Sequence, residues 1–340
     1  MKDTDSNRWQ RIRNTARRFG LDDFLLALIG VVILAYLWPY PGTDESPVPL
    51  AEIANYGVSV IFFFYGLRLS PQKLRAGLTN WRLHIVVHVA TFILFPLLAL
   101  GIRPFFAGEE YHMLWLAIFF LAALPSTVSS SVVMVSMAGG NIPGAIFNAS
   151  ISSLLGVFIT PLWMGLVLET GPGEFELTEV VIKLVLQVLL PVVLGVLLYG
   201  RWGAFAERNK TTLKYIDQFI ILLIVYTSFC ESFANNLFSQ FSGVAMICLT
   251  LGMMGLFFLI YYLLMVLCRL LGFNREDQIT AVFCGSKKSL VQGAVMSKVL
   301  FAGAASAGII LLPIMIYHAF QLLVVSIIAQ RLARQNEVRV

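Results

Sequence analysis

Long apolar stretches alternate with short polar connectors along the whole chain of 340 residues. Each stretch is close to the roughly 20 apolar residues that cross the roughly 30 Å hydrocarbon layer of a membrane as a helix. We expect spans at 21–38, 50–67, 83–100, 113–137, 143–168, 180–200, 212–233, 244–270, 279–301 and 307–329. The pattern therefore predicts an all-α polytopic membrane protein with ten transmembrane helices.

The connector 169–179 divides these spans into two sets of five. Because five is odd, the second set would run through the membrane in the opposite sense, which is the arrangement of an inverted-topology repeat in many transporters. The expected organisation is a basic N-terminal segment at 1–20, a first five-helix repeat at 21–168, an outer connector at 169–179, a second repeat at 180–330 and a tail at 331–340.

Basic residues gather in alternate connectors. With the N-terminus placed in the cytoplasm, most of the 24 Lys and Arg residues lie on the inner side, and the outer connectors hold only Arg103. Cytoplasmic loops carry such an excess of bases. We therefore expect a multi-pass protein of the plasma membrane, which in a bacterium is the inner membrane, with both termini in the cytoplasm. The net charge of +5 arises in these loops and does not indicate nucleic acid binding.

Two spans are interrupted, the fourth and the ninth, and they hold matching places in the two sets of five. The fourth reads LPSTVSSSVVMVSMAGGN, in which Pro125 removes a backbone donor, and the ninth reads AVFCGSKKSLVQGAVMSK. Interrupted spans at equivalent places in two halves indicate a transporter's binding site. The candidate site residues on these spans are Thr127, Ser129, Ser130, Ser131, Ser286, Lys287, Lys288, Ser289 and Gln292. Each serine taken alone fits plain helix packing as well.

Lys287 and Lys288 are the residues of the ninth span that are least favourable to insert into a membrane. A lysine at the centre of an inserting helix costs roughly 2.5–3.5 kcal/mol, so an idle pair is not expected. Adjacent residues of an intact helix point about 100° apart. Either the two amines have different partners, or the backbone opens at this point.

Other polar residues inside spans are Asn148 and Glu231, which we add to the candidate site, and His84 and His88. Glu231 is the acidic residue best placed to compensate a lysine or carry a proton, although exposure at the membrane interface explains it equally well. The two histidines lie four residues apart without a third ligand, which favours packing over a metal site. No cofactor is expected, and no spacing joins a nucleophile to a base, so the protein is not expected to be an enzyme.

The segments LPSTVSSSVVMVSMAGGN, ASISSLLGVFITPL, LLIVYTSFCESF and VFCGSKKSL together resemble the bile acid:sodium symporter-like family, in the branch of vertebrate solute carrier family 10 member 7 and related bacterial symporter-like proteins. The resemblance covers about 21–334. It implies inverted repeats arranged as a core and a panel domain, with the broken fourth and ninth helices crossing near mid-membrane. It also implies a substrate crevice between core and panel.

This chain departs from the sodium-coupled members of that family at the ligands they use. Where they carry adjacent Ser and Asn in the fourth helix, this chain has Ser130 and Ser131, and their Glu and Gln in the ninth helix correspond to the stretch 286–288. Their fifth-helix hydroxyls fall on Ala145 and Ala149. Too few oxygen ligands remain for a hard cation, and an ammonium group nearby would repel it.

We therefore expect a lysine ammonium to occupy the place of the missing sodium charge and to hold the crossing helices together. Carbonyl ends of the half-helices and the hydroxyls of residues 129–131 would accept its hydrogen bonds. Gain and loss of a proton by this lysine is then a candidate coupling event. In the alternative interpretation, one lysine binds the carboxylate of an organic anion directly.

The resulting prediction is a secondary active transporter of a small organic, anionic solute, with sodium or a proton as the coupling ion and sodium coupling in doubt. Its expected partners are the solute and the lipid bilayer, without an obligate protein partner. The alternative is a membrane regulator that does not transport, because a fold alone does not determine function. The vertebrate branch is associated with calcium homeostasis, which supports this alternative.

Overall fold

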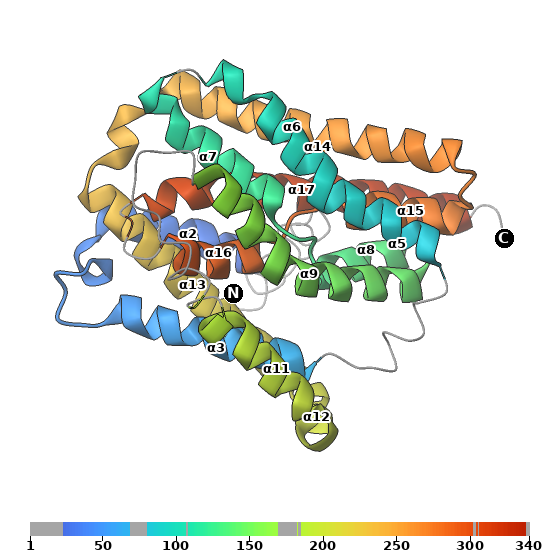
Figure 1. Cartoon of the computed structure of the whole chain (residues 1–340), viewed down its shortest axis with the longest axis horizontal. Helices are drawn as coiled ribbons and strands as arrows, with labels where there is room; N and C mark the ends of the chain where they lie inside the picture. The colour runs from blue at the N-terminus through green and yellow to red at the C-terminus, as the bar shows by residue number, and fades with distance from the viewer. Residues whose placement is uncertain are drawn as a thin grey trace, which may run out of the picture.

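The computed structural model describes residues 23–68, 80–106, 108–168, 182, 185–301, 304 and 306–337. Every regular element within these ranges is helical (Figure 1). The predictions for the N-terminal segment 1–20, for the connector 169–179 and for the last three residues lie outside the described part of the chain.

The helices correspond closely to the apolar stretches of the sequence. In chain order they are α2 (Asp23–Leu37), η1 (Tyr40–Gly42), α3 (Leu50–Leu67), α5 (Trp81–Val89), η2 (Ala90–Leu94), α6 (Phe95–Gly101), η3 (Arg103–Phe105), α7 (Glu109–Ala123), α8 (Ser129–Ala138), α9 (Ile142–Leu168), η4 (Val185–Leu189), α11 (Leu190–Leu197), α12 (Tyr199–Arg208), α13 (Lys210–Ala234), η5 (Leu237–Gln240), α14 (Gly243–Leu270), α15 (Arg275–Gly285), α16 (Leu290–Leu300) and α17 (Ala307–Glu337). The elements η2 and η4 are π-helical.

By length and composition, six helical stretches of the described residues can cross a membrane, and a seventh is added if Val185–Leu197 and Tyr199–Arg208, which meet at 95°, form one span. Two shorter apolar helices, Asp23–Leu37 and Tyr111–Ala123, accompany them. The prediction of an all-α polytopic membrane protein is confirmed at this level. The count of ten spans and their inverted repeat stay predictions.

The interruptions expected in two spans occur at the predicted places. The stretch 113–137 forms α7 and α8 with an irregular segment at 124–128, and the stretch 279–301 forms α15 and α16 with an irregular segment at 286–289. Pro125 has no N–H and cannot continue α7. The second break follows Gly285, and the hydroxyl of Ser289 accepts a hydrogen bond from the N–H of Gln292 to begin α16.

The helices form two groups. The smaller group comprises α2, α3, α11, α12 and α13, which contact one another, and the larger group comprises the other long helices. In Figure 1, α3, α11 and α12 lie at the bottom, whereas α6 and α14 lie at the top. Within the smaller group α3 and α11 cross closely, because a Cβ on Gly195 would collide with the backbone of Phe63 and Leu67.

The two groups meet mainly where α13 packs on α16 and α17, and where α16 packs on α3. Hydrogen bonds between described residues cross this boundary at two places. The amide of Gly308 donates to the Ser232 hydroxyl at 3.0 Å, and the Tyr65 hydroxyl donates to the carbonyl of Ser150 at 2.8 Å.

A polar network holds one end of the larger group together. The Asp277 carboxylate on α15 accepts hydrogen bonds from Asn80 at 2.7 Å and from Asn141 at 2.8 Å. The Thr280 hydroxyl also accepts the backbone N–H of Asn141 at 2.8 Å. These bonds tie the start of α5, the turn between α8 and α9, and α15 into one unit, which positions the two broken helices relative to each other.

Candidate functional site

The two helix breaks contact each other inside the larger group. The Ser126 hydroxyl, in the first break, donates to the carbonyl of Cys284 at the end of α15. In return, the backbone N–H of Ser289 donates to the carbonyl of Pro125 at 2.9 Å. Backbone groups that leave a helix inside a membrane must find partners in the protein. Here each break supplies partners to the other, so the two irregular segments depend on one another.

Lys288 lies at this crossing, and its side chain is fully buried. Its Nζ donates to three backbone carbonyl oxygens, those of Thr91 at 2.8 Å, Ala122 at 2.6 Å and Leu124 at 2.7 Å. The Nζ also lies 4.0 Å from the centre of the Phe95 ring, a distance at which an ammonium is attracted to the ring face. We call this arrangement the Lys288 cage.

The Thr91 carbonyl is free to bind Lys288 because of the π-helical turn at Ala90–Leu94. In that turn the N–H of Phe95 donates to the carbonyl of Ala90, five residues earlier. The next residue, Pro96, has no N–H to offer to Thr91. The same shortage of donors affects the carbonyl of Phe92, which accepts the indole N–H of Trp163 at 2.8 Å instead.

The other two carbonyls of the cage belong to the end of α7. The helical donor for Ala122 would be the N–H of Ser126, but this group donates to the Ser152 hydroxyl at 2.9 Å. Leu124 precedes Pro125, where the helix stops. The carbonyl end of a helix carries roughly half an elementary negative charge. The end of α7 thus provides both hydrogen-bond acceptors and a field that stabilises a cation.

The donors and acceptors of the cage match in number. An ammonium group has three N–H donors and no acceptor, and three carbonyl oxygens receive them. Hard cations such as sodium also take oxygen ligands, but these oxygens already bind an ammonium whose charge would repel a second cation. The residues at the crossing therefore do not fit a bound sodium ion in this arrangement.

The backbone of Lys288 is held as firmly as its side chain. Its N–H donates to Gln321 Oε1 and its carbonyl accepts from Gln321 Nε2, both at 2.8 Å. The Tyr317 hydroxyl donates to the carbonyl of Ser286 at 2.7 Å. Through Gln321 and Tyr317, α17 replaces the helical partners that the break between α15 and α16 removes.

Lys287 is also fully buried, but among the described residues its Nζ has one hydrogen-bond partner, the carbonyl of Ser130 at 3.1 Å. Both sequence alternatives for the lysine pair therefore occur together: the backbone opens at 286–289, and the two amines point to different partners. Among the described residues, neither amine forms an ion pair with a carboxylate.

The hydroxyl residues of the first break bond mainly to one another. Thr127 and Ser131 are joined at 2.8 Å, and the Ser130 hydroxyl donates to Thr127 at 2.9 Å. Ser129 is the first residue of α8, and its side chain lies outside the described part. Among the described side chains, the acceptors for the lysines are thus backbone carbonyls, and the hydroxyls of Ser130 and Ser131 do not contribute as we had expected.

Ser286 and Gln292 complete the set on the ninth span. The Ser286 hydroxyl donates to the carbonyl of Val282 at 2.7 Å. Gln292 Nε2 points to the carbonyl of Ser153 at 3.5 Å, while Gln292 Oε1 is buried without a partner among the described residues. This amide oxygen is an unused hydrogen-bonding group next to the crossing, whereas the Ser153 hydroxyl contacts that of Tyr65.

Asn148 does not join the crossing. Its side chain lies 3.1 Å from His84 Nδ1 and donates to the carbonyl of Gly144, so it packs α9 on α5. The His84 ring lies 4.1 Å from that of Phe147, in agreement with a packing histidine. Among the described residues, no group of three or more His, Cys, Asp or Glu side chains is placed to hold a metal ion.

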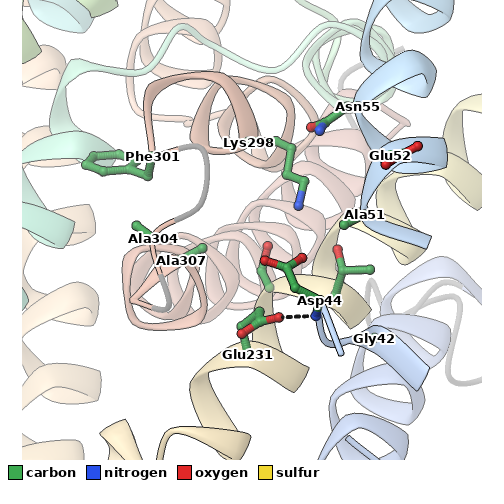
Figure 2. A pocket seen from close by; sticks show the side chains of 12 residues that line it. Gly42, Asp44, Ala51, Glu52, Asn55, Glu231, Lys298, Phe301, Ala304 and Ala307 are labelled. Carbon is green, nitrogen blue, oxygen red and sulfur yellow. Dashed lines mark hydrogen bonds between the residues drawn. The ribbon is translucent and has the colours of Figure 1, made fainter. Parts of the chain in front are cut away.

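Glu231 lies at a different place, in a cavity of about 240 Å³ between the two helix groups. Figure 2 shows this cavity with Lys298 entering it from α16 and Glu231 from α13. We call it the Lys298 cavity. Its polar lining residues include Asp44, Glu52, Asn55, Ser228, Glu231 and Lys298. The lysine that faces Glu231 is therefore Lys298, and neither Lys287 nor Lys288 lines this cavity.

Sequence reasoning did not select Lys298 or Asp44 as site residues. Lys298 gave a usable signal, because a charged residue inside a span indicates function by default. Asp44 gave none, since an acidic residue in a connector is expected to be solvated. Glu231 Oε1 in fact accepts the backbone N–H of Asp44 at 2.8 Å, a contact between distant parts of the chain.

Comparison of the sequence with known proteins shows which family the chain belongs to. The sequence profile of the SBF-like CPA transporter family matches residues 22–334. The chain belongs to this family. It is 44% identical over 321 residues to an uncharacterized protein of Pseudomonas aeruginosa, covering 94% of this chain and 95% of that protein.

Two further relatives carry functional names. The Escherichia coli protein named "Putative symporter YfeH" is 39% identical over 318 residues, covering 93% of this chain and 94% of the relative. "Sodium/bile acid cotransporter 7-B" of Xenopus laevis is 31% identical over 313 residues, covering 90% of each chain. The resemblance to the bile acid:sodium symporter-like family is thereby confirmed. The chain is a multi-pass membrane protein of a transporter family, not of an enzyme family.

Proposed function

We propose that the protein is a secondary active transporter that moves a small organic solute by alternating access, with the ammonium of Lys288 in the place of a coupling cation. The Lys288 cage carries this proposal. A positive group with three carbonyl partners links α7, the π-helical turn and the break before α16. In a sodium-coupled transporter a bound ion would have to supply such a link.

The helix order supports the inverted repeat of the proposal. One set of five comprises α2, α3, the unit α5–α6, the broken pair α7–α8 and α9; the other comprises η4–α11, α13, α14, the broken pair α15–α16 and α17. The broken pairs then hold the fourth place in each set, as expected for an inverted-repeat transporter. The larger helix group would be the core and the smaller group the panel.

The orientation follows from the loop charges. We place both termini in the cytoplasm and the protein in the bacterial inner membrane, because the basic connectors then lie inside. The Lys298 cavity would lie toward the outer side of the membrane. A solute with an anionic group fits the proposal, because Lys298 is a cation that faces the cavity between core and panel.

Uptake by proteoliposomes tests this function. The purified protein is reconstituted and offered radiolabelled small organic acids and amino acids, first in sodium chloride and then in potassium chloride. Saturable uptake of at least one compound is expected, at the same rate in both salts. The variant Lys288→Met should lose this uptake, whereas Lys214→Met, which alters an exposed lysine of α13, should retain it.

Two outcomes contradict the proposal. Uptake that requires sodium, or thermal stabilisation of the wild-type protein by sodium but not potassium, would show that an alkali ion still binds. Absence of saturable uptake across the whole panel would favour the alternative function, a membrane regulator that does not transport.

A further inference from the structure

The Lys298 cavity contains charges of both signs that do not neutralise one another by direct contact. Asp44, Glu52 and Glu231 come from the smaller helix group, and Lys298 comes from the larger group. Among the described residues no ion pair joins Lys298 to these carboxylates. In Figure 2 the Lys298 amine nevertheless points into the cavity, toward Asp44 and Glu231. Apart from the hydrogen bond that Glu231 Oε1 accepts from the Asp44 N–H, the charged groups that share this cavity can bind a solute.

A second observation points to a ligand at the same place. Ser228 lines the cavity and is only 2% exposed, and its hydroxyl has no hydrogen-bond partner among the described residues. Buried hydroxyl groups nearly always have a partner, because leaving one unpaired is costly. Asn55 adds an amide from α3 to the lining. Hydrogen-bonding groups are therefore available beside the charges.

The size of the cavity limits its occupant. A volume of about 240 Å³ corresponds to roughly eight water molecules at ~30 Å³ each. A solute of a few carbon atoms with its polar groups fills such a space. Phe301, Ala304 and Ala307 provide a less polar wall against which a short hydrocarbon chain can pack.

We infer that the Lys298 cavity binds a small zwitterion with a carboxylate and a primary ammonium group, that is, a compound of the amino acid type. Its carboxylate contacts Lys298, its ammonium contacts Glu231 and Asp44, and the Ser228 hydroxyl completes the site. A simple anion would meet the surrounding carboxylates, and a simple cation or metal ion would meet the Lys298 ammonium. Like charges at short range repel, so a molecule with both signs is preferred.

This inference rests on the proposed function only in taking the bound zwitterion to be the transported solute. Binding can therefore be measured separately from transport. Zwitterion binding without uptake would support the proposed binding site and contradict the proposed transport function. Uptake of a solute without any preference for zwitterions would support the proposed transport function and contradict the proposed zwitterion site.

The binding experiment uses three chemical series on the purified full-length protein. Glycine, β-alanine and γ-aminobutyrate are the zwitterions; acetate, propionate and butyrate are the matched anions; methylamine, ethylamine and propylamine are the matched cations. Isothermal titration calorimetry should detect at least one zwitterion that binds 10-fold or more tightly than the anion and the cation matched to it. Equal or tighter binding of the anion or the cation, or no binding by any of the nine, overturns the inference.

Three variants locate the site of binding. We expect Lys298→Gln and Glu231→Gln each to weaken zwitterion binding 10-fold or more, and Ser228→Ala to weaken it about threefold. Lys214→Gln and Glu207→Gln alter exposed residues of α13 and α12, and they should leave the affinity unchanged. If Lys298→Gln does not fold, Ser228→Ala, which removes a single buried oxygen, decides the point. Unchanged affinity in Ser228→Ala together with Glu231→Gln would overturn the assignment.

Discussion

At the scale of single residues, Lys288 connects three carbonyl oxygens that the local backbone leaves without donors. Lys287, its neighbour, contacts a single carbonyl among the described residues, that of Ser130 inside α8. Both side chains are fully buried, so burial alone does not distinguish them. The difference lies in how many buried acceptors depend on each amine.

This difference predicts unequal losses of stability. Lys288→Met leaves three buried carbonyls without a donor, and each unsatisfied group costs about 1–3 kcal/mol. Lys287→Met removes a single contact, with the carbonyl of the half-buried Ser130 inside α8. The thermal unfolding midpoint of the purified protein in detergent should fall more for Lys288→Met than for Lys287→Met. The exposed-site variant Lys214→Met should unfold at the wild-type temperature. A larger decrease for Lys287→Met would show that the cage contributes less than the contact with Ser130.

At the scale of helices, two π-helical turns are each followed closely by a proline, but only one of them contributes a carbonyl to the Lys288 cage. Ala90–Leu94 precedes Pro96 and releases a carbonyl to Lys288. Val185–Leu189 precedes Pro191 in the smaller group, away from the lysine pair. π-Turns often mark functional positions, and here one of the two supplies a ligand to the cage.

The pair provides a matched test. Pro96→Ala restores an N–H that can donate into the turn and compete with Lys288 for the Thr91 carbonyl. Proteoliposome uptake should decrease several-fold, while the far-ultraviolet circular dichroism spectrum stays unchanged. Pro191→Ala restores an N–H in a similar local context, where no described lysine amine binds a carbonyl of the turn, so its uptake should stay close to that of the wild type. Equal uptake by the two variants would mean that the turn at 90–94 has no special role.

At the scale of the whole molecule, the Lys298 cavity lies on the boundary between the two helix groups, which hydrogen bonds of the described residues cross at Gly308 and Tyr65. The boundary packs closely beside the cavity, since a Cβ on Gly308 would come within 3.0 Å of Ser232 Cβ. Cβ atoms of a disulfide lie about 3.5–4.5 Å apart. A small adjustment therefore allows a covalent link between the groups.

A cysteine pair tests whether the groups move against each other. With the native cysteines replaced by alanine, Ser232→Cys combined with Gly308→Cys should form a disulfide on oxidation and stop uptake. Reduction with dithiothreitol should restore uptake, and each single cysteine variant should be insensitive to the oxidant. Full uptake by the cross-linked protein would exclude movement at this boundary as a step of transport.

The same boundary separates what local sequence predicts from what it does not. Pro125 and Gly285 marked the two breaks because a missing N–H and a missing side chain act on the backbone around them. Asp44 and Lys298 belong to different helix groups and share no local pattern. Their encounter depends on the packing of α16 against α3 and α13, which no spacing along the chain encodes.

The sequence by itself determined the membrane helices and the places where two of them break. The hydrocarbon layer requires a minimum length of apolar helix, and each backbone N–H and C=O group needs a hydrogen-bond partner nearby. Both requirements act locally, so they can be recognised in the sequence. Only the tertiary structure decided which carbonyls accept hydrogen bonds from Lys288. It also decided that Glu231 and Lys298 face the same cavity. Those contacts join residues from separate helices, and their geometry exists only after the helices have packed.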